Sequence, residues 1–182
     1  MIAFPRRREA PPHAVQRRGA GAPRRRTGGL ALLAGGLAVL CSCPALASDI
    51  TGLWMTDDGE GIIEIRPCGE HRCGRIAWTK DPLGPDGKIS LDRNNPDPSL
   101  RTRRICGLQI ITGLKQQGDG TWADGRVYNP DNGQTYGMKI RRESPDLVKA
   151  HGYLGFELFG QTQDWRRVAK NPGGCEDAAK RS

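Results

Sequence analysis

Residues 121–142 read TWADGRVYNPDNGQTYGMKIRR, two runs of alternating polarity separated by a turn sequence. In the second run Tyr136, Met138 and Ile140 fall on one face, which is the pattern of a strand with one buried side. The Pro-Asp-Asn-Gly sequence at 130–133 is typical of a tight turn, because its glycine can adopt a positive φ. The stretch predicts an antiparallel β-hairpin and points to an all-β fold class.

Similar short runs, broken by Gly, Pro, Asp and Asn, continue on both sides of this hairpin. We expect eight strands, the last broken near Gly160, and we expect Ile76 and Trp78 to share a face. Eight strands joined mainly by tight turns predict a single antiparallel up-and-down β-barrel, because closure leaves no exposed edge. The interior of such a barrel is either filled by side chains or holds one small ligand. The predicted strands are 52–56, 61–67, 73–80, 108–114, 121–128, 134–142, 146–153 and 156–168.

The N-terminal quarter has the organisation of a secretory signal peptide. Three arginines at 24–26 precede an apolar run of eleven residues at 30–40, and the Ala-Leu-Ala sequence at 45–47 has the form of a cleavage site. Eleven helical residues cover about 16 Å, too short for a hydrocarbon core of roughly 30 Å. We therefore expect a periplasmic or secreted protein. The predicted divisions are a signal peptide with a long disordered basic n-region (1–47), a β-barrel domain (48–168) and a C-terminal tail (169–182).

Removal of this leader changes the charge of the chain. The leader holds 8 of the 28 Lys and Arg residues but 1 of the 20 acidic residues, so 20 basic and 19 acidic side chains remain. A net charge near +1 leaves no basic footprint for nucleic acid. The Leu-Cys-Ser-Cys sequence at 40–43 resembles a bacterial lipobox with Cys43 as the modified residue, and membrane association is expected only if that lipidation occurs.

Four cysteines remain after cleavage: Cys68, Cys73, Cys106 and Cys175. In an oxidising compartment an even number favours disulfides, and three pairings are possible. We favour Cys68–Cys73, across a short loop, and Cys106–Cys175. The loop-entropy model assigns roughly 2 kcal/mol to the small ring and roughly 4 kcal/mol to the large one, which would tie the tail to mid-chain. The alternative, zinc bound by Cys68, His71 and Cys73, has a spacing that fits no common zinc motif, so we predict no metal.

Residues 81–104 are predicted to form a long loop, with one helical turn near 98–101. Long loops in small domains often serve as lids or binding surfaces. The carboxylates and amides of this loop could ligate calcium, but their order is not the EF-hand pattern, and the alternative is side chains that bond to local backbone. The arginines at 101–104 could meet an anion or could simply be solvated. The candidate loop residues are Asp92, Asn94, Asn95, Asp97 and Arg103.

Side chains on the predicted strands form a second group of candidates. Alternation places Trp122, Asp124, Arg126 and Tyr128 on one face of their strand. If that face points inward, Arg126 could bind a carboxylate or a phosphate. If it points outward, the charges form ordinary surface pairs, and we favour this direction for them. The candidate ligand-binding residues are Trp78, Arg126, Tyr128, Tyr136 and His151.

Several stretches together carry a family resemblance: 52–54, 67–76, 92–98, 122–130, 133–136, 152–155 and 165–168. Over about residues 51–168 the chain resembles the secreted bacterial domain of unknown function 2147, which implies an exported single β-barrel domain and no assigned activity. A looser resemblance is to the lipocalin superfamily, which has Gly-x-Trp on its first strand and an Arg late in the barrel. That resemblance implies that Trp54 closes one barrel end and that Arg166 or Arg167 stacks over it.

The chain shows no catalytic set. A base such as His151 would need a nucleophile or carboxylate partner, and no serine lies in a Gly-x-Ser-x-Gly setting. We therefore expect a monomeric, non-enzymatic barrel without cofactor that binds a small apolar or amphipathic ligand in the cell envelope. The alternative is a protein-interaction module, an envelope assembly factor or inhibitor, that uses the 81–104 loop. An enzyme, the third possibility, would need an inward cluster around His151 with shifted pKa values.

Overall fold

The computed structural model describes residues 49–173 and Cys175. The predicted signal peptide over 1–47, with its alternative modification at Cys43, lies outside these residues. Within the described part of the chain, no helix is both long and apolar enough to cross a membrane.

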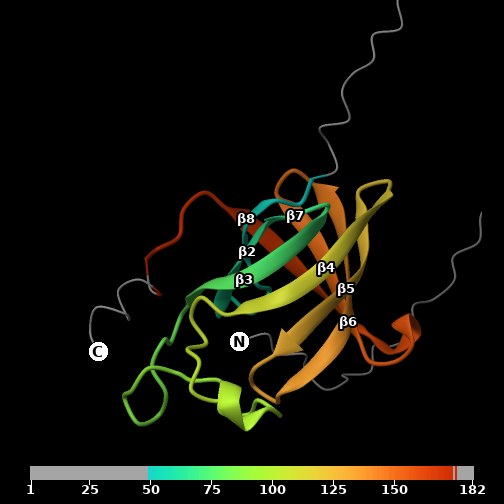
Figure 1. The fold of residues 1–182 in the computed structure, drawn as a ribbon. Coiled ribbons are helices and arrows are strands. Elements are labelled where there is room, and N and C mark those ends of the chain that lie inside the picture. The colour runs from blue at the N-terminus through green and yellow to red at the C-terminus, as the bar shows by residue number, and fades with distance from the viewer. Residues whose placement is uncertain (1–48, 174, 176–182) are drawn as a thin grey trace, which may run out of the picture. The chain divides into compact units, whose positions relative to one another are not determined.

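Eight antiparallel strands form a closed barrel in which each strand pairs with the next and β8 pairs with β1 (Figure 1). The predicted all-β up-and-down barrel is therefore confirmed. Two short 3-10 turns, η1 (Pro98–Leu100) and η2 (Glu157–Phe159), lie in the connections, the first of them at the predicted helical turn. The strands are β1 (Gly52–Met55), β2 (Gly61–Cys68), β3 (His71–Thr79), β4 (Gln109–Gly118), β5 (Thr121–Asn129), β6 (Gln134–Ser144), β7 (Leu147–Tyr153) and β8 (Gln161–Val168).

The last strand begins later than the sequence suggests. The predicted strand at 156–168 starts only at Gln161, and residues 154–160 form an exposed turn that contains η2. Gly155 takes a φ of +74°, which ends the extended backbone that follows β7. The turn places several apolar side chains in solvent.

Two bulges overturn expectations that rested on strict alternation. Ile62 pairs with Trp78 while Ile63 pairs with Ile76, so Ile76 and Trp78 lie on opposite faces of β3. In β5 the register shifts between Trp122 and Gly125, where Asp124 takes a φ of +60°. The predicted common face of β5 is therefore wrong, because one extra residue reverses the order of inward and outward side chains.

Side chains fill the body of the barrel. Three tryptophans, one each from β1, β5 and β8, are at most 2% exposed and pack with aliphatic residues from the other strands. The interior of this eight-stranded barrel is therefore filled by side chains and does not hold a ligand cavity in its body. The largest fully buried side chains include Trp54, Trp122, Trp165, Ile63, Ile65, Ile110, Ile111, Leu114, Met138 and Ile140.

The two ends of the barrel differ because the long connections all lie at one of them. Antiparallel order places the connections that precede β2, β4, β6 and β8 together, and we call this the loop end. The short turns that precede β3, β5 and β7 lie at the other end, with residues 49–51, and we call this the closed end. In Figure 1 the loop end is at the bottom.

Two disulfides confirm the expected pairing. Cys68 is bonded to Cys73 across the turn between β2 and β3, and Cys106 is bonded to Cys175. The second bond, 69 residues apart in sequence, holds the segment after β8 against the loop end, where Asn171 Nδ2 donates a hydrogen bond of 2.9 Å to the Ala77 carbonyl. The start of the C-terminal tail therefore packs along β3.

Candidate functional site

The closed end is built around Trp54. Its ring is fully buried, and its Nε1 donates to the Ile50 carbonyl at 2.8 Å. Arg167 lies over this ring with its guanidinium carbon 4.2 Å from the centroid, which settles the choice between Arg166 and Arg167. Gly52 beside them takes a φ of +137°, which other residues rarely adopt, and a Cβ there would displace the Arg167 guanidinium, 2.2 Å away. These contacts close this end of the barrel and give Trp54 and Arg167 a structural role.

A second arginine covers a second tryptophan near the same end. The guanidinium carbon of Arg72 lies 4.6 Å from the Trp122 ring centroid, and its Nε donates to Asp49 at 3.1 Å. Burial acts to raise the pKa of Asp49, but hydrogen bonds from Arg72 and Thr51 outweigh it and lower the pKa below its ordinary value. The carboxylate therefore stays ionised and keeps Arg72 in place.

At the loop end, Asp92 anchors the 81–104 loop to the barrel. Its side chain is fully buried and accepts hydrogen bonds from Tyr128 Oη (2.5 Å), Asn95 Nδ2 (2.8 Å) and Arg103 Nη2 (2.8 Å). Burial, followed by the contact with Asp92, raises the pKa of Tyr128 to about 12. A buried carboxylate with three donors stabilises a fixed loop and leaves no open coordination position for a metal ion.

The other loop candidates also bond to groups of the protein. Asn94 donates to the backbone carbonyls of Pro130 and Asp131, at 3.3 and 2.9 Å, and so joins the loop to the β5–β6 turn. Asp97 accepts from the backbone and hydroxyl of Ser99 and caps η1. Among the described residues no cluster of three His, Cys, Asp or Glu side chains could hold a metal ion. These bonds hold the loop against the barrel, where it forms one wall of the loop end.

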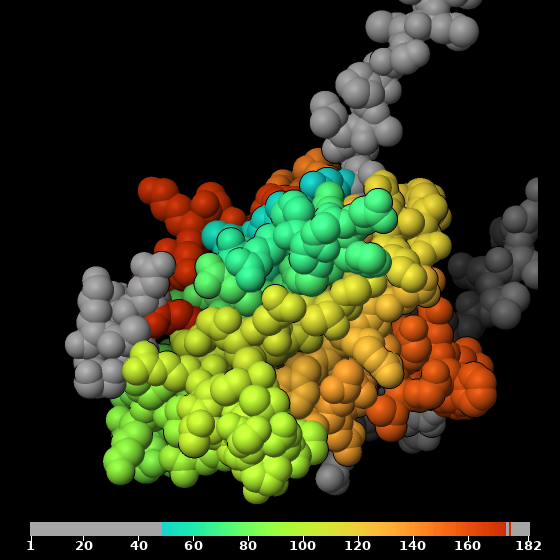
Figure 2. Space-filling model, in the orientation of Figure 1, coloured from blue at the N-terminus to red at the C-terminus, as the bar shows by residue number. Residues whose placement is uncertain are grey.

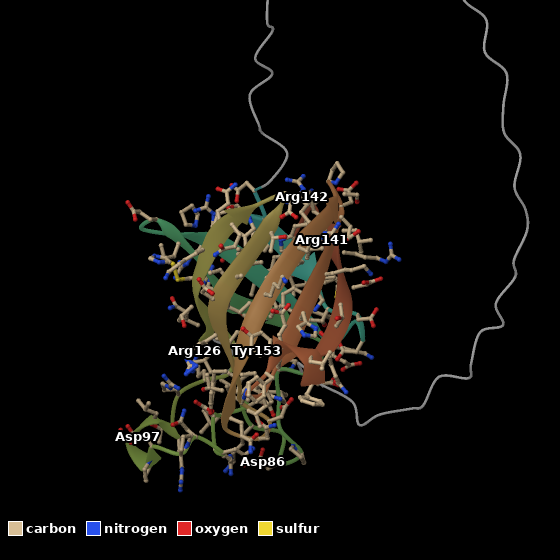
Figure 3. All side chains as sticks on the ribbon, turned by 90° about the vertical axis from the view of Figure 1, so that its right-hand side faces the viewer. Asp86, Asp97, Arg126, Arg141, Arg142 and Tyr153 are labelled. Carbon is tan, nitrogen blue, oxygen red and sulfur yellow. A yellow bond between two sulfur atoms is a disulfide. The ribbon has the colours of Figure 1, made fainter. Side chains whose placement is uncertain are left out.

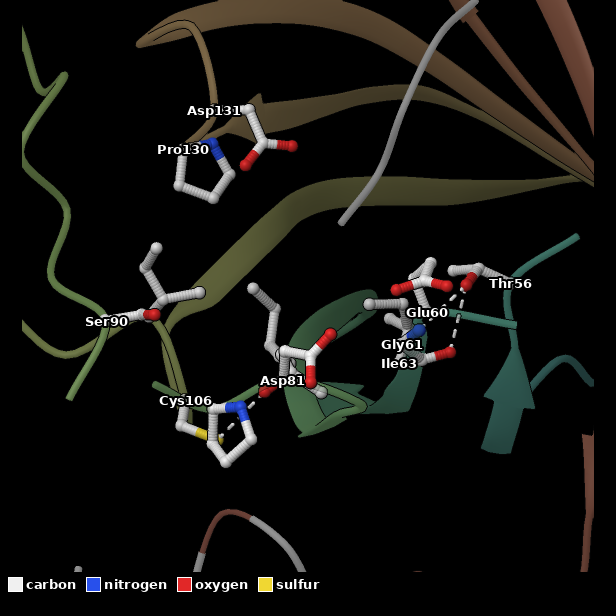
Figure 4. Close-up of a pocket in the computed structure, with 13 residues that line it drawn as sticks. Thr56, Glu60, Gly61, Ile63, Asp81, Ser90, Cys106, Pro130 and Asp131 are labelled. Carbon is white, nitrogen blue, oxygen red and sulfur yellow. Dashed lines mark hydrogen bonds between the residues drawn. The ribbon is translucent and has the colours of Figure 1, made fainter. Parts of the chain in front are cut away.

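Between this wall and the mouth of the barrel lies a cavity of about 110 Å³ (Figure 4), which we call the mouth pocket. Its apolar surface includes Ile63, Ile76 and Ile105, the first two of them part of the buried core. In Figure 4, Thr56 and Glu60 lie on one side of the pocket, and Ser90 and Cys106 lie on the other. The filled core forms the base of the pocket, so the cavity sits above the barrel interior.

The polar side of the mouth pocket is acidic. Glu60, Asp81 and Asp131 line it, and the lining residues that the structure describes include no lysine or arginine. Lys80 approaches from outside and pairs with Glu60 at 2.9 Å. An apolar base beneath three carboxylates suits a small molecule with an apolar body and a polar or cationic head.

The predicted strand candidates lie elsewhere and do not meet at one place. Trp78 is half-buried opposite Ile62, and Arg126 is exposed on the barrel's outer surface near Tyr153 (Figure 3). Tyr136 Oη contacts Gln134 and Asn132 at the β5–β6 turn. His151 bonds through Nδ1 to Thr162 and through Nε2 to the Glu157 carbonyl, both at 2.9 Å. Tyr128 serves the loop anchor.

Sequence reasoning missed the residues that line the mouth pocket. Ile63 and Ile76 fall within predicted strands, and neither they nor Ile105 was given a binding role. One signal was available for Ile105, since it is an isolated β-branched apolar residue between a run of arginines and Cys106. The three carboxylates come from three separate connections, and no sequence pattern joins them.

Comparisons with known proteins agree with this architecture. No curated protein matches the chain. Among solved structures, protein HP1028 from the human pathogen Helicobacter pylori, described as belonging to the lipocalin family, is similar with a TM-score of 0.60 at 20% identity. The match covers 72% of this chain and 89% of that one, and at this identity it shows a shared fold. Residues 52–167 match the family of uncharacterized proteins conserved in bacteria, DUF2147, and the chain therefore belongs to that family.

Proposed function

We propose that this barrel binds a small amphipathic molecule in the mouth pocket, with an apolar body against Ile63, Ile76 and Ile105 and a cationic head near the carboxylates. The observation that carries the proposal is the combination of an apolar base and an acidic rim in one partly open cavity. Ligand sites occur preferentially in the mouths of β-barrels, which supports the same assignment.

The volume of the pocket limits the ligand. An engineered apolar cavity of about 150 Å³ binds benzene, so about 110 Å³ admits a group of roughly that size or slightly smaller. A longer ligand would have to extend outward past the acidic rim, because the tryptophan-filled core blocks the path inward. We therefore assign one short alkyl or aryl group to the pocket.

The cellular setting belongs to the same proposal. Two disulfides support maturation in an oxidising compartment, as expected for a protein of the cell envelope. A ligand of the envelope would then reach the mouth pocket directly from solvent.

Three probes of similar shape and different charge test the assignment: benzylamine, benzyl alcohol and benzoate. We expect binding in that order of affinity, measured by NMR shifts of the methyl groups of Ile63, Ile76 and Ile105. Asp81→Asn should reduce the preference for benzylamine over benzyl alcohol several-fold, since one attractive charge is lost. Glu70→Gln removes an equal charge at an exposed position of the closed end and serves as the matched control.

A blocking variant separates this site from others. Ser90→Phe adds a ring at the wall of the mouth pocket and should abolish the methyl shifts for all three probes. If Ser90→Phe binds the three probes as tightly as the unchanged protein does, the mouth pocket is not the binding site. If benzoate binds better than benzylamine to the unchanged protein, the proposed cationic head is wrong.

A further inference from the structure

The turn between β7 and β8 exposes a group of large apolar side chains. Leu154, Phe156, Leu158 and Phe159 are 60%, 77%, 87% and 68% exposed, and we call these four residues the apolar tip. In the described part of the chain, Leu83 is the one other large apolar residue with comparable exposure, at 42%. Four such residues within six positions differ from the single scattered apolar residues of an ordinary surface.

Local bonds hold the tip in this exposed form. Within η2, the Phe159 and Gly160 amides donate to the Phe156 and Glu157 carbonyls at 3.1 and 3.2 Å. The His151 ring bonds to the Glu157 carbonyl, and a Cβ at Gly160 would lie 2.4 Å from that ring. The polar backbone of the turn is therefore fastened to β7 while its side chains remain in solvent.

Basic side chains flank the tip. A shallow depression beside Leu158 is lined by Lys139, Arg141 and Lys149 on the outer surface of β6 and β7, with Glu157 as its acid. Each cation forms an exposed ion pair, with Glu157 (2.8 Å), Glu143 (3.3 Å) and Asp164 (2.7 Å) respectively. Exposed pairs contribute little, so these cations can exchange their carboxylates for the phosphates of a lipid surface.

We propose that the apolar tip docks the barrel on an anionic lipid surface, with the Leu and Phe side chains among the acyl chains and the flanking Lys and Arg at the phosphates. A convex apolar projection next to basic residues has the chemistry of an interfacial anchor. The projection is visible at the right of the barrel in the space-filling view (Figure 2). The three cations beside the tip complement the charge of an anionic surface, which is why we assign a lipid surface as the occupant.

The position of the tip relates it to the mouth pocket. The β7–β8 turn and the 81–104 loop both belong to the loop end of the barrel. Docking by the tip would therefore keep the pocket end of the protein next to the lipid. The docking proposal does not depend on the ligand, because it rests on exposed residues that do not line the mouth pocket.

Co-sedimentation with lipid vesicles tests the docking. The protein is the full chain as it is recovered from the expressing cell. The vesicles contain phosphatidylcholine alone or mixed with phosphatidylglycerol, and no pocket ligand is added. We expect binding to the mixed vesicles, weakened by salt and weaker by about tenfold for Lys139→Gln/Lys149→Gln. The variant Phe156→Ser/Leu158→Ser/Phe159→Ser should no longer bind the mixed vesicles. Its side chains are exposed, so the near-ultraviolet circular dichroism of the barrel should not change.

A matched control uses the other exposed leucine. Leu83→Ser makes the same chemical change in the 81–104 loop and should bind mixed vesicles like the unchanged protein, whereas Leu158→Ser should bind several-fold more weakly. Equal binding of these two variants would overturn the proposal. So would absence of binding to mixed vesicles together with concentration-dependent dimers in sedimentation velocity that the triple variant abolishes, because the tip would then be a contact between copies.

Discussion

The closed end and the loop end are made of the same strands, but the closed end is tightly packed and the loop end holds a cavity. At the closed end, arginines lie over the buried rings of Trp54 and Trp122, and their remaining donors bond to backbone or to Asp49. At the loop end a buried carboxylate holds a long loop above a cavity. Cavities and exposed apolar groups reduce stability, so a small barrel can carry them at one end when the other is tightly packed.

The largest expected effect is at the closed end. Trp54→Ala should lower the free energy of unfolding by about 4 kcal/mol, because a fully buried indole and its Arg167 contact are lost. Urea denaturation followed by fluorescence would measure the change, with Trp54→Phe as the milder control. The folded fraction should still bind benzylamine, since the mouth pocket lies at the other end. Loss of probe binding in protein that remains folded would show that the two ends are coupled.

The anchor of the loop end should come next. Asp92→Ala leaves Tyr128, Asn95 and Arg103 without their acceptor and should cost about 3 kcal/mol, as expected when one partner of a buried charged network is removed. The same variant should weaken benzylamine binding, because the loop supplies one wall of the pocket. Asp92→Asn keeps part of the acceptor geometry, so its free energy of unfolding should lie between those of the unchanged protein and Asp92→Ala. Full probe affinity in Asp92→Ala would mean that the pocket does not need the anchored loop.

A smaller effect should appear at alkaline pH. The pKa of Tyr128 is raised from 10.0 to about 12, so its contribution is fully present below pH 10 and is lost as the pH rises through about 12. Tyr128→Phe should cost about 1 kcal/mol at neutral pH, the value of one lost hydrogen bond. Absorbance titration at the tyrosinate band should lose its latest component in this variant. A titration of Tyr128→Phe that keeps this component would contradict its assignment to Tyr128.

The smallest effect should be the acid response of the closed end. The pKa of Asp49 is lowered, so its contribution is present above its ordinary value of 3.8 and is lost as the pH falls through the lower value in the folded state. Because the carboxylate is half exposed, Asp49→Asn should cost less than about 1 kcal/mol at neutral pH. The difference from the unchanged protein should shrink as the solution is acidified. If the difference in stability between the two proteins stays constant across acidic pH, the charge of Asp49 does not contribute to that stability.

The loop anchor shows how much of the site could be read in advance. The length of the 81–104 loop marked it as a functional candidate. The interpretation that its polar side chains bond to local backbone describes Asp97, whereas Asp92 bonds to the side chains of Asn95 and Arg103. The partner of Asp92 on β5, Tyr128, was placed instead among ligand-binding candidates. A contact between residues 36 positions apart leaves no trace in local alternation, so sequence reasoning could not pair them.

By itself the sequence determined the all-β class and the eight strands, because alternation and turn residues are local properties. Close spacing favoured the Cys68–Cys73 bond, and Cys106–Cys175, 69 residues apart, was favoured only as the remaining pair. Tertiary structure alone decided which face Trp78 and Trp122 take, since single bulges at Ala77 and Asp124 reverse the alternation. It also decided that three carboxylates from separate connections meet over an isoleucine surface, and that Phe156, Leu158 and Phe159 stay in solvent. These features depend on how distant segments close around the barrel ends, and no run of neighbouring residues encodes them.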